Sequence, residues 1–515
     1  MNMRPRRPNE HDIIMKRMIL WVLPLFISSV CKAEDITIRY KGTTAKVEQK
    51  VKDSIHVHVY GANVEIESQF KSRKLTLKLT GKSDDGQLVL KTAGKAEVKL
   101  DNLTLTSQEG APLWLKNKKK VEVKAVKGTE NTLTVTACKD TANHKGAVIW
   151  AKDKLLLTGK GTLNIIATGD GCRGIKTKKD VTIEELSLNV TTSGNNLGEK
   201  PFGMGGFPMP DFGQMPDSVQ MPGFGQMPDF GQMPDFSQIP GFGQMPDFNI
   251  PDSIKKLFPI FPDSLGGFPN FGGGFGGGFA GKHKYYASAK GIASKGKITI
   301  NSGNVTVRTS TPGAEGVEGK KGVVFNGGTI DIFSPDDAIN SNATIEFNGA
   351  NVMARSKGND AVDANPEGGF FPPFGGDNGK KIEPAIIIRG GIVYAWSQVG
   401  SPEEGLDSDV SPLALEGGTV FSVGGSIGEA PSVPTTETAK QPTLLLCGLN
   451  ITKDEPVSIL NADGRLIHTL TVPFSFRGSA SIVTCPGFKV GHTYTVKTKG
   501  YEKTFTLSGP FTIVR

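Results

Sequence analysis

Two neighbouring segments of the sequence place acidic side chains at matching positions around an aliphatic residue. The segments are SPDDAINSNATIEFNGA, which contains Ile339, and KGNDAVDANPEGG, which contains Val362. Carboxylate and amide oxygens are the ligands that Ca²⁺ prefers, in sets of about six to eight. If the distance between the two aliphatic residues is a structural period, the acidic groups form a column along the fold, and such a column predicts a cation site.

A repeating unit accounts for this distance. Units such as GIASKGKITINSGNVTVRTS and GVEGKKGVVFNGGTIDIFS join two alternating strands through a short Asn/Gly-rich turn. With spacings of 25, 22, 23 and 44 residues, the aliphatic anchors of successive units are Ile292, Val317, Ile339, Val362 and Leu406. The last spacing corresponds either to two units or to one unit that carries the insertion PEGGFFPPFGGDNGKKIEP.

The repeat extends toward the N-terminus. Related units surround Val148 and Ile175, and more degenerate strands reach back to about residue 36. Short strands at a period of about 20–30 residues, with no helical pattern between them, predict an all-β solenoid of stacked coils. Leucine-rich repeats share this period, but their Leu/Asn consensus is absent.

Stacked coils turn equivalent sequence positions into columns with a spacing of about 4.8 Å. Two residues before each anchor, the side chains are Arg173, Lys290, Glu315, Asp337, Asp360 and Glu404. Directly after each anchor, they are Lys176, Ala293, Glu318, Asn340, Asp363 and Asp407. Carboxylates at this spacing repel each other by about 1 kcal/mol even in water, so four successive acidic coils call for counter-ions.

We therefore predict that calcium binds along the two columns. The predicted ligands are Glu315, Glu318, Asp336, Asp337, Asn340, Asp360, Asp363, Glu404 and Asp407. The alternative is a solvated acidic edge that Lys320, Lys321 and Lys357 neutralise. Arg173 and Lys290 continue the first column, where a cation beside calcium either grips a uronate carboxylate or abstracts its α-proton in a lyase. For Lys290, the alternative is an ion pair with Glu315 one coil away.

A second candidate surface lies on the strand that ends each unit. Alignment of these strands turns outward the side chains of Phe333, Tyr394, Trp396 and Phe421, with Arg308 and Arg355 among them. Because aromatic rings cover the apolar C–H face of pyranose rings, this row predicts a carbohydrate-binding site along which an extended glycan lies. The alternative is that the 366–385 insertion or the C-terminal segment covers the rings. Trp114 and Trp150 are expected in the core.

The ends and the middle of the chain depart from the repeat. Residues 1–33 predict a signal peptide, since MKRMILWVLPLFISSVCKA has a basic start, an apolar run and a small residue before the mature chain. Met15 is a second candidate for the initiator methionine. Val30 argues against lipid attachment at Cys31. We expect β-helix coils over residues 34–196 and 285–440, a disordered loop of GQMPDF-type units over 197–284, and a small β module over 441–515.

Charge and cysteines bear on the compartment and the partner. Residues 34–200 have 29 Lys and Arg against 20 Asp and Glu, whereas residues 301–440 have 9 against 18. An exported chain with an acidic half is a poor nucleic-acid binder. The apolar run of the signal segment is too short for a permanent membrane anchor, and no other segment predicts a membrane span. We expect a monomer in the periplasm, at the cell surface or outside the cell.

The oxidising compartment predicts disulfides, with Cys138–Cys172 and Cys447–Cys485 as the pairs that proximity in the sequence favours.

Residues 36–440 resemble a family of exported bacterial carbohydrate-binding proteins with a right-handed, single-stranded parallel β-helix of the pectate-lyase type. The resemblance rests on the units KGIASKGKITINSGNVTV and DDAINSNATIEFNGANV, on the Gly/Pro/Phe-rich loop between coils, and on the terminal segment ILNADGRLIHTLTVP…CPGFKVGHTYTV. It implies this fold, binding to cellulose-like or pectin-like plant polysaccharide, and bound calcium. It implies no established catalytic residue.

Three functions fit these observations. We favour a non-catalytic carbohydrate-binding protein whose partner is a plant-type polysaccharide. The second is a calcium-dependent polysaccharide lyase with Lys290 or Arg173 as the base, and the third is a structural surface protein or adhesin. The sequence has no Ser/His/Asp order and no metal-binding histidine cluster, and a fold does not establish chemistry, so we expect no enzyme activity.

Overall fold

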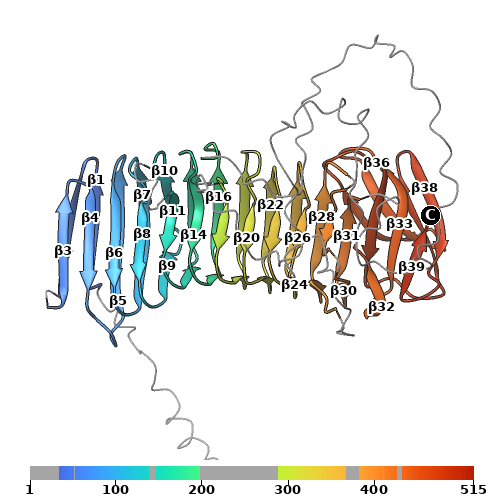
Figure 1. Ribbon diagram of the computed structural model, residues 1–515, viewed down its shortest axis with the longest axis horizontal. Helices are drawn as coiled ribbons and strands as arrows, with labels where there is room; N and C mark the ends of the chain where they lie inside the picture. The colour runs from blue at the N-terminus through green and yellow to red at the C-terminus, as the bar shows by residue number, and fades with distance from the viewer. Residues whose placement is uncertain are drawn as a thin grey trace, which may run out of the picture. The chain divides into compact units, whose positions relative to one another are not determined.

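The computed structural model describes residues 34–51, 53–138, 146–197, 288–366, 382–400, 402–409, 411–425 and 432–515. Its elements, β1 to β39, are all β-strands, as the sequence predicts (Figure 1). The predicted signal peptide, residues 1–33, and residues 198–284 of the predicted loop lie outside the described residues. The described part of the chain has no helix long and apolar enough to cross a membrane.

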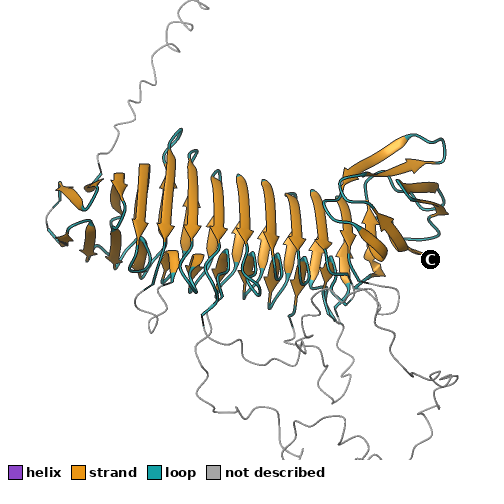
Figure 2. Ribbon diagram, turned by 90° about the horizontal axis from the view of Figure 1, so that it is seen from above, coloured by secondary structure: helices purple, strands orange, loops and turns teal. Residues whose placement is uncertain are grey.

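Most strands belong to three ladders, in which each strand pairs in parallel with the equivalent strand of the next coil (Figure 2). Ladder 1 contains β4 (Asn63–Ser68), β6 (Gln87–Thr92), β8 (Leu113–Asn117), β11 (Ala147–Ala151), β14 (Arg173–Thr177), β17 (Ile292–Ser294), β20 (Val317–Gly319), β23 (Ile339–Ser341), β26 (Val362–Ala364) and β29 (Leu406–Asp407). Ladder 2 contains β9 (Val121–Ala125), β12 (Leu155–Thr158), β15 (Val181–Ile183), β18 (Ile298–Ile300), β21 (Val323–Phe325), β24 (Ile345–Phe347), β27 (Ile386–Ile388), β30 (Leu413–Leu415) and β32 (Pro434–Ala439). Ladder 3 contains β10 (Glu130–Val135), β13 (Thr162–Ala167), β16 (Ser187–Thr192), β19 (Asn304–Thr309), β22 (Thr329–Ser334), β25 (Asn351–Ser356), β28 (Ile392–Ser397) and β31 (Thr419–Val423).

The remaining strands lie at the two ends of the ladders. At the N-terminal end they are β1 (Ile36–Lys41), β2 (Thr44–Gln49), β3 (Ile55–Tyr60), β5 (Leu75–Ser83) and β7 (Ala96–Ser107), and β7 pairs with both β9 and β10. At the C-terminal end they are β33 (Thr443–Ile451), β34 (Pro456–Asn461), β35 (Leu466–Thr471), β36 (Phe476–Thr484), β37 (Thr493–Thr498), β38 (Tyr501–Thr506) and β39 (Phe511–Val514). Here β36 pairs antiparallel with β31, the last strand of ladder 3.

The anchors stack in the predicted order. Along ladder 1, Ile175 pairs with Ile292, and the next partners in turn are Val317, Ile339, Val362 and Leu406. The direct pairing of Val362 with Leu406 shows that the 44-residue spacing is one coil with an insertion. Each coil has three strands rather than the two that the sequence predicts. The anchor before Ile175 is Ile149, not Val148.

Alternation of apolar and polar residues explains why these segments form strands around one core. In β19, Val305 and Val307 are buried while Thr306 and Arg308 are half-exposed. The inward side chains of all three ladders join a single hydrophobic cluster. Strands of three residues suffice, because each pairs with a coil on either side and so satisfies its backbone groups.

The predicted disulfides are absent, since Cys172, Cys447 and Cys485 are free thiols. Burial raises the pKa of Cys172 to about 12, and neighbouring Cys138 adds to the shift. Thr443 pairs with Thr484 between β33 and β36, so Cys485 lies beyond one end of this strand pair while Cys447 lies well inside it. Their separation exceeds the Cα distance of about 7 Å that a disulfide tolerates. Proximity in sequence was a poor guide to this pair.

Small residues directly before the anchors let ladder 1 approach ladder 3 closely. A Cβ on Gly291 would lie 2.4 Å from Val307 Cγ1, and a Cβ on Gly316 would lie 2.4 Å from Ile332 Cγ2. One coil further, the residue before the anchor is Ala338, and Ala354 takes the register position of Ile332. A glycine before the anchor therefore lies beside a β-branched residue of ladder 3, whereas an alanine before the anchor lies beside an alanine. The combined volume of the two side chains stays small enough for the two ladders to approach closely.

We predict that Gly291→Ala lowers the free energy of unfolding by about 1–3 kcal/mol, because its Cβ overlaps Val307. Val307→Ala alone should also destabilise the protein, by about 2 kcal/mol, because it leaves a cavity. The double variant recreates the arrangement of Ala338 with Ala354, so it should cost less than the sum of the single variants. Denaturant unfolding measures all three free energies, with Gly500→Ala as the control because a Cβ there meets nothing within 4 Å. Strict additivity would contradict this packing argument.

Candidate functional site

The register of ladder 1 brings the predicted acidic columns together. Glu318 pairs with Asn340, which pairs with Asp363, which in turn pairs with Asp407. The other column follows the same stacking: backbone N–H groups of successive coils donate to the carbonyl oxygens of Asp337, Asp360 and Glu404 at 2.9, 3.3 and 3.0 Å. Both columns therefore lie side by side, one in the turn that enters ladder 1 and the other in the strand itself.

Three carboxyl groups of these columns are buried together, and that of Glu404 is half-buried. Asp337, Asp360 and Asp363 are 4, 7 and 7% exposed. Burial, followed by repulsion from neighbouring carboxylates, raises the pKa of Asp337 and Asp360 well above the ordinary value. The same causes raise the pKa values of Asp363 and Glu404 to about 8, with Asp407 as the main repelling neighbour of both. Without a cation, these groups resist full ionisation at neutral pH.

In two of these carboxyl groups, only one of the two oxygens accepts a hydrogen bond. Asn340 Nδ2 donates to Asp337 Oδ2 at 3.0 Å and to Asp363 Oδ2 at 2.7 Å. Within the described part of the chain, the buried atoms Asp337 Oδ1 and Asp363 Oδ1 accept no hydrogen bond. A buried acceptor without a donor costs free energy, so a cation near these oxygens would stabilise the fold.

Calcium fits this set by donor chemistry, because the available ligands are hard carboxylate and amide oxygens. The set consists of Asp337, Asn340, Asp360, Asp363, Glu404 and Asp407. The described side chains form no preassembled group of three or more metal ligands. Binding a cation here therefore requires the carboxylates to turn toward it, and the unpaired oxygens of Asp337 and Asp363 are the ones free to do so.

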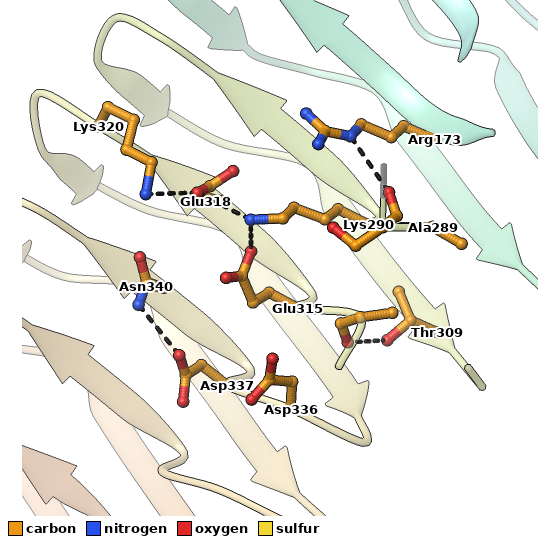
Figure 3. A network of polar contacts seen from close by, with 12 residues as sticks. Arg173, Ala289, Lys290, Thr309, Glu315, Glu318, Lys320, Asp336, Asp337 and Asn340 are labelled. Atoms are coloured by element: carbon orange, nitrogen blue, oxygen red, sulfur yellow. Dashed lines mark hydrogen bonds and ion pairs between the residues drawn. The ribbon is translucent and has the colours of Figure 1, made fainter. Parts of the chain in front are cut away.

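At its cationic end, the site is an ion-pair network rather than a metal site (Figure 3). The Lys290 ammonium pairs with Glu315 and, at 2.8 Å, with Glu318, while Lys320 pairs with Glu318 at 2.5 Å. Although burial opposes it, the pairing with Lys290 and Lys320 lowers the pKa of Glu318 to about 2. Arg173 Nε donates to the carbonyl oxygen of Ser288 at 3.2 Å.

This network corrects three predicted roles. Glu315 and Glu318 are neutralised by lysine, so they are not calcium ligands in this arrangement. Lys290 Nζ lies between the carboxylates of Glu315 and Glu318, so it is engaged by them and is not placed to act as the base of a lyase. The alternative that Lys290 pairs with Glu315 is the one that the structure bears out. Asp336 Oδ1 is also engaged, by Asn359 Nδ2 at 2.8 Å.

The predicted row of outward aromatic residues is largely covered. The register is as expected, since Tyr394 pairs with Phe421 between β28 and β31. However, Trp396 and Phe421 are both 0% exposed and pack in a second hydrophobic cluster with residues of β33 to β38. The hydroxyl of Tyr394, which is half-buried, lies 2.8 Å from His468 Nε2. Alternation predicted which way the side chains point, but it did not reveal that the C-terminal strands lie over them.

The outward residues that remain on ladder 3 are largely paired with one another. Asp331 forms ion pairs with Arg308 and, at 2.5 Å, with Arg355. The guanidinium of Arg355 also lies 5.7 Å from the ring centroid of Phe333. These contacts leave Phe333 as a single half-buried ring rather than part of a platform. The predicted carbohydrate-binding row is wrong for Trp396 and Phe421, because both rings are buried.

Sequence reasoning missed a pair of outward tryptophans on ladder 1. Trp114 and Trp150 pair directly with each other, and both side chains are half-buried while the flanking Leu113, Leu115 and Ile149 are fully buried. The misplaced anchor explains the error. With Val148 as the anchor, Trp150 points inward, whereas the true anchor Ile149 turns it outward, because a slip of one residue exchanges the two faces of a strand.

We predict that the acidic columns make stability fall as pH rises when calcium is removed by a chelator. These carboxyl groups have a higher pKa in the folded state than in the unfolded state, where it is about 4. Their stabilising contribution is complete below pH 4 and is lost as pH rises through the folded-state value, about 8 for Asp363 and Glu404.

Thermal unfolding in chelator between about pH 4 and 8 tests this. Asp337→Asn/Asp363→Asn should flatten the fall in Tm, and the exposed pair Asp84→Asn/Asp463→Asn should leave it unchanged. A Tm that rises over this range in the unaltered protein would contradict the electrostatic account.

We also predict that Trp396→Ala acts on stability. Removal of a fully buried indole should lower the free energy of unfolding by about 3–5 kcal/mol, as measured by denaturant titration. Phe333→Ala, at a half-exposed ring of the same ladder, should cost much less. Similar small losses for both variants would place Trp396 at the surface after all.

Comparison with known proteins identifies related chains. Residues 36–200 and 279–361 match the model of a family described as carbohydrate-binding domain-containing protein. A carbohydrate-binding domain-containing protein of Acetivibrio thermocellus is 27% identical over 117 residues, which are 22% of this chain. The matched region spans 40% of that relative's length. A solved structure, described as a polysaccharide lyase-like protein from C. thermocellum in its gadolinium derivative, is 17% identical. It covers 64% of this chain and 92% of its own, with a TM-score of 0.38.

The matched segments contain the coils from which the resemblance was predicted. They include the anchors from Ile175 to Ile339 and both tryptophans of ladder 1. Over residues 36–200 and 279–361, this chain is therefore similar to the carbohydrate-binding domain-containing proteins, as its repeated units predict.

Proposed function

We propose that the protein is an exported, non-catalytic polysaccharide-binding protein for cellulose-like or pectin-like glycans. The observation that carries the proposal is the in-register surface of ladder 1, which repeats the same side-chain positions from coil to coil. A polymer with a regular repeat is complementary to such a surface, because successive sugars meet successive coils. The similarity to carbohydrate-binding domain-containing proteins supports a glycan as that polymer.

Calcium has a defined place in this proposal. Asp337, Asp360, Asp363, Glu404 and Asp407 would hold it, with Asn340 fixing one oxygen of Asp337 and of Asp363. The ion would neutralise carboxylates that burial and mutual repulsion disfavour. It would also offer a positive charge to a glycan oxygen or uronate carboxylate.

The finer description of the fold belongs to the same proposal. Three parallel ladders with one strand per coil in each suit a single-stranded parallel β-helix of the pectate-lyase type. A right-handed path is the general preference for parallel crossovers. Residues 441–515 would be a small β module, since β34, β35, β37 and β38 make an antiparallel sheet of their own.

A calcium-dependent lyase is a second candidate, because the structure offers a lysine other than Lys290 as a base. Burial, together with the charges of Arg173, Lys295 and Lys178, lowers the pKa of Lys176 to about 8. Near neutral pH, an amine with this pKa is unprotonated in a larger fraction of molecules than an ordinary lysine, so it is more available to accept a proton. In β-elimination, Lys176 would take the C5 proton of a uronate while the glycosidic oxygen at C4 leaves.

Affinity electrophoresis of residues 34–515 in gels that contain polygalacturonate or hydroxyethyl cellulose tests the proposed function. We expect retardation that increases with calcium, and Asp337→Asn/Asp363→Asn should weaken the calcium-dependent part about tenfold, which is ~1.4 kcal/mol. The control pair Asp84→Asn/Asp463→Asn should bind as the unaltered protein does.

A parallel incubation, read by the ultraviolet absorbance of unsaturated uronides, separates binding from cleavage. Rising absorbance that Lys176→Ala abolishes would establish the lyase. Absence of retardation in both gels would refute polysaccharide binding and leave the adhesin as the remaining function.

A further inference from the structure

The outward surface of ladder 1 has a second set of side chains, N-terminal to the acidic columns. Its centre is the tryptophan pair, with Lys176 as the next residue in the same column. Two positions further along the strands lies a row of lysines, one from each of six successive coils. This lysine row consists of Lys91, Lys116, Lys152, Lys178, Lys295 and Lys320.

Backbone pairing fixes the lysine row. Lys91 pairs with Lys116 between β6 and β8. Each later lysine donates its backbone N–H to the coil before it: Lys152 to Leu115, Lys178 to Ala151, Lys295 to Thr177 and Lys320 to Ser294, at 2.9, 3.2, 3.2 and 3.0 Å. The backbones of six lysines are thus set out at the spacing of the coils, about 4.8 Å along the ladder.

The middle of the row is available to an anion. Lys152, Lys178 and Lys295 are exposed, and none of them forms an ion pair with another residue that the structure describes. At the ends of the row, Lys91 pairs with Glu65, and Lys320 pairs with Glu318. Charges of one sign that repel each other along a rigid surface attract a partner with regularly spaced opposite charges.

The tryptophan pair lies directly beside these ammonium groups. The ring centroids of Trp114 and Trp150 are 6.3 Å apart at an interplanar angle of 86°. Lys116 Nζ lies 3.7 Å from the centroid of Trp114, and Lys178 Nζ lies 5.8 Å from that of Trp150. A sugar ring in contact with either indole therefore has an ammonium group within reach of its substituents.

We infer that this face of ladder 1 binds an acidic polysaccharide, whose pyranose rings contact Trp114 and Trp150 while its carboxylates lie along the lysine row. The inference rests on the proposed polysaccharide-binding function and adds the charge class of the glycan and the place where it binds. A neutral glycan would use the indoles but leave the ammonium row without a partner. Nucleic acid could use both, but the similarity of residues 36–200 to carbohydrate-binding domain-containing proteins favours a glycan.

The lysine row and the acidic columns of ladder 1 should differ in whether they need calcium to bind an acidic glycan. The lysine row meets carboxylates directly, so binding there needs no calcium and weakens as salt increases. The acidic columns can meet a uronate only through a cation. Binding that persists in chelator therefore reports the lysine row, whereas the gain on adding calcium reports the acidic columns.

The test titrates residues 34–515 with oligogalacturonate in chelator and follows tryptophan fluorescence. Of the three tryptophans in this part of the chain, Trp396 is fully buried, so a change on binding reports Trp114 and Trp150. Lys152→Gln/Lys178→Gln/Lys295→Gln should weaken binding roughly tenfold and reduce its dependence on salt. Trp150→Ala should weaken it several-fold and diminish the fluorescence change, and Trp150→Phe should restore much of the affinity.

Matched controls come from exposed positions outside the tryptophan pair and the lysine row. Lys46→Gln/Lys453→Gln/Lys497→Gln removes the same charge from side chains that are 77, 63 and 56% exposed, and Tyr60→Ala removes a ring that is 70% exposed. Both controls should bind as the unaltered protein does. Equal losses in the control and test variants would show that only net charge matters and would overturn the site.

Three other results would overturn the inference. The first is unchanged affinity of the test variants while the protein still binds polysaccharide, which would leave the proposed function intact. The second is binding in chelator that is no tighter for oligogalacturonate than for neutral cello-oligosaccharide, or that is tighter for a single-stranded oligonucleotide. The third is failure to bind any polysaccharide with or without calcium, which would refute the proposed function as well.

Discussion

The in-register parallel pairing of successive coils is the constraint on which the rest of the structure depends. Each strand of a ladder finds its backbone partners in the coils before and after it, so strands of three residues are stable only as members of the stack. The same pairing fixes the distance between equivalent side chains at about 4.8 Å. Whatever residue type the sequence repeats at one position is thereby turned into a column, with the attraction or repulsion that follows from that distance.

Because equivalent positions of successive coils stack in register, the two halves of ladder 1 present columns of opposite charge. From β8 onward, the position after each anchor carries Trp114, Trp150, Lys176, Ala293 and then Glu318, Asn340, Asp363 and Asp407. The change of sign occurs where Lys290 and Lys320 pair with Glu318, so the network in Figure 3 is a boundary between two electrostatic environments. On the cationic side, the side chains of Lys152, Lys178 and Lys295 are exposed. On the acidic side, Asp337, Asp360 and Asp363 are buried and their pKa values are raised.

Much of this arrangement was accessible from the sequence, because it depends on spacing alone. The anchors from Ile175 to Leu406 and both columns beside them have the predicted register. The ion pair between Lys290 and Glu315, one coil apart in the same column, was among the predicted alternatives. Two features depend on information that spacing does not contain: the C-terminal strands cover Trp396, and Cys447 and Cys485 lie at different points along one strand pair. Both involve the C-terminal strands, which no repeat relates to the coils.

The two groups of outward aromatic residues differ in position along the stack, and the difference bears on their roles. Trp396 and Phe421 belong to the last coils of ladder 3, where the stack needs a cover because its final strand would otherwise expose unpaired backbone groups. β36 supplies this cover by pairing with β31, and the aromatic rings form the hydrophobic contact beneath it. Trp114 and Trp150 lie between coils that are paired on both sides. Capping does not account for the two outward, half-buried indoles there, and the proposed glycan would contact them beside the lysine row.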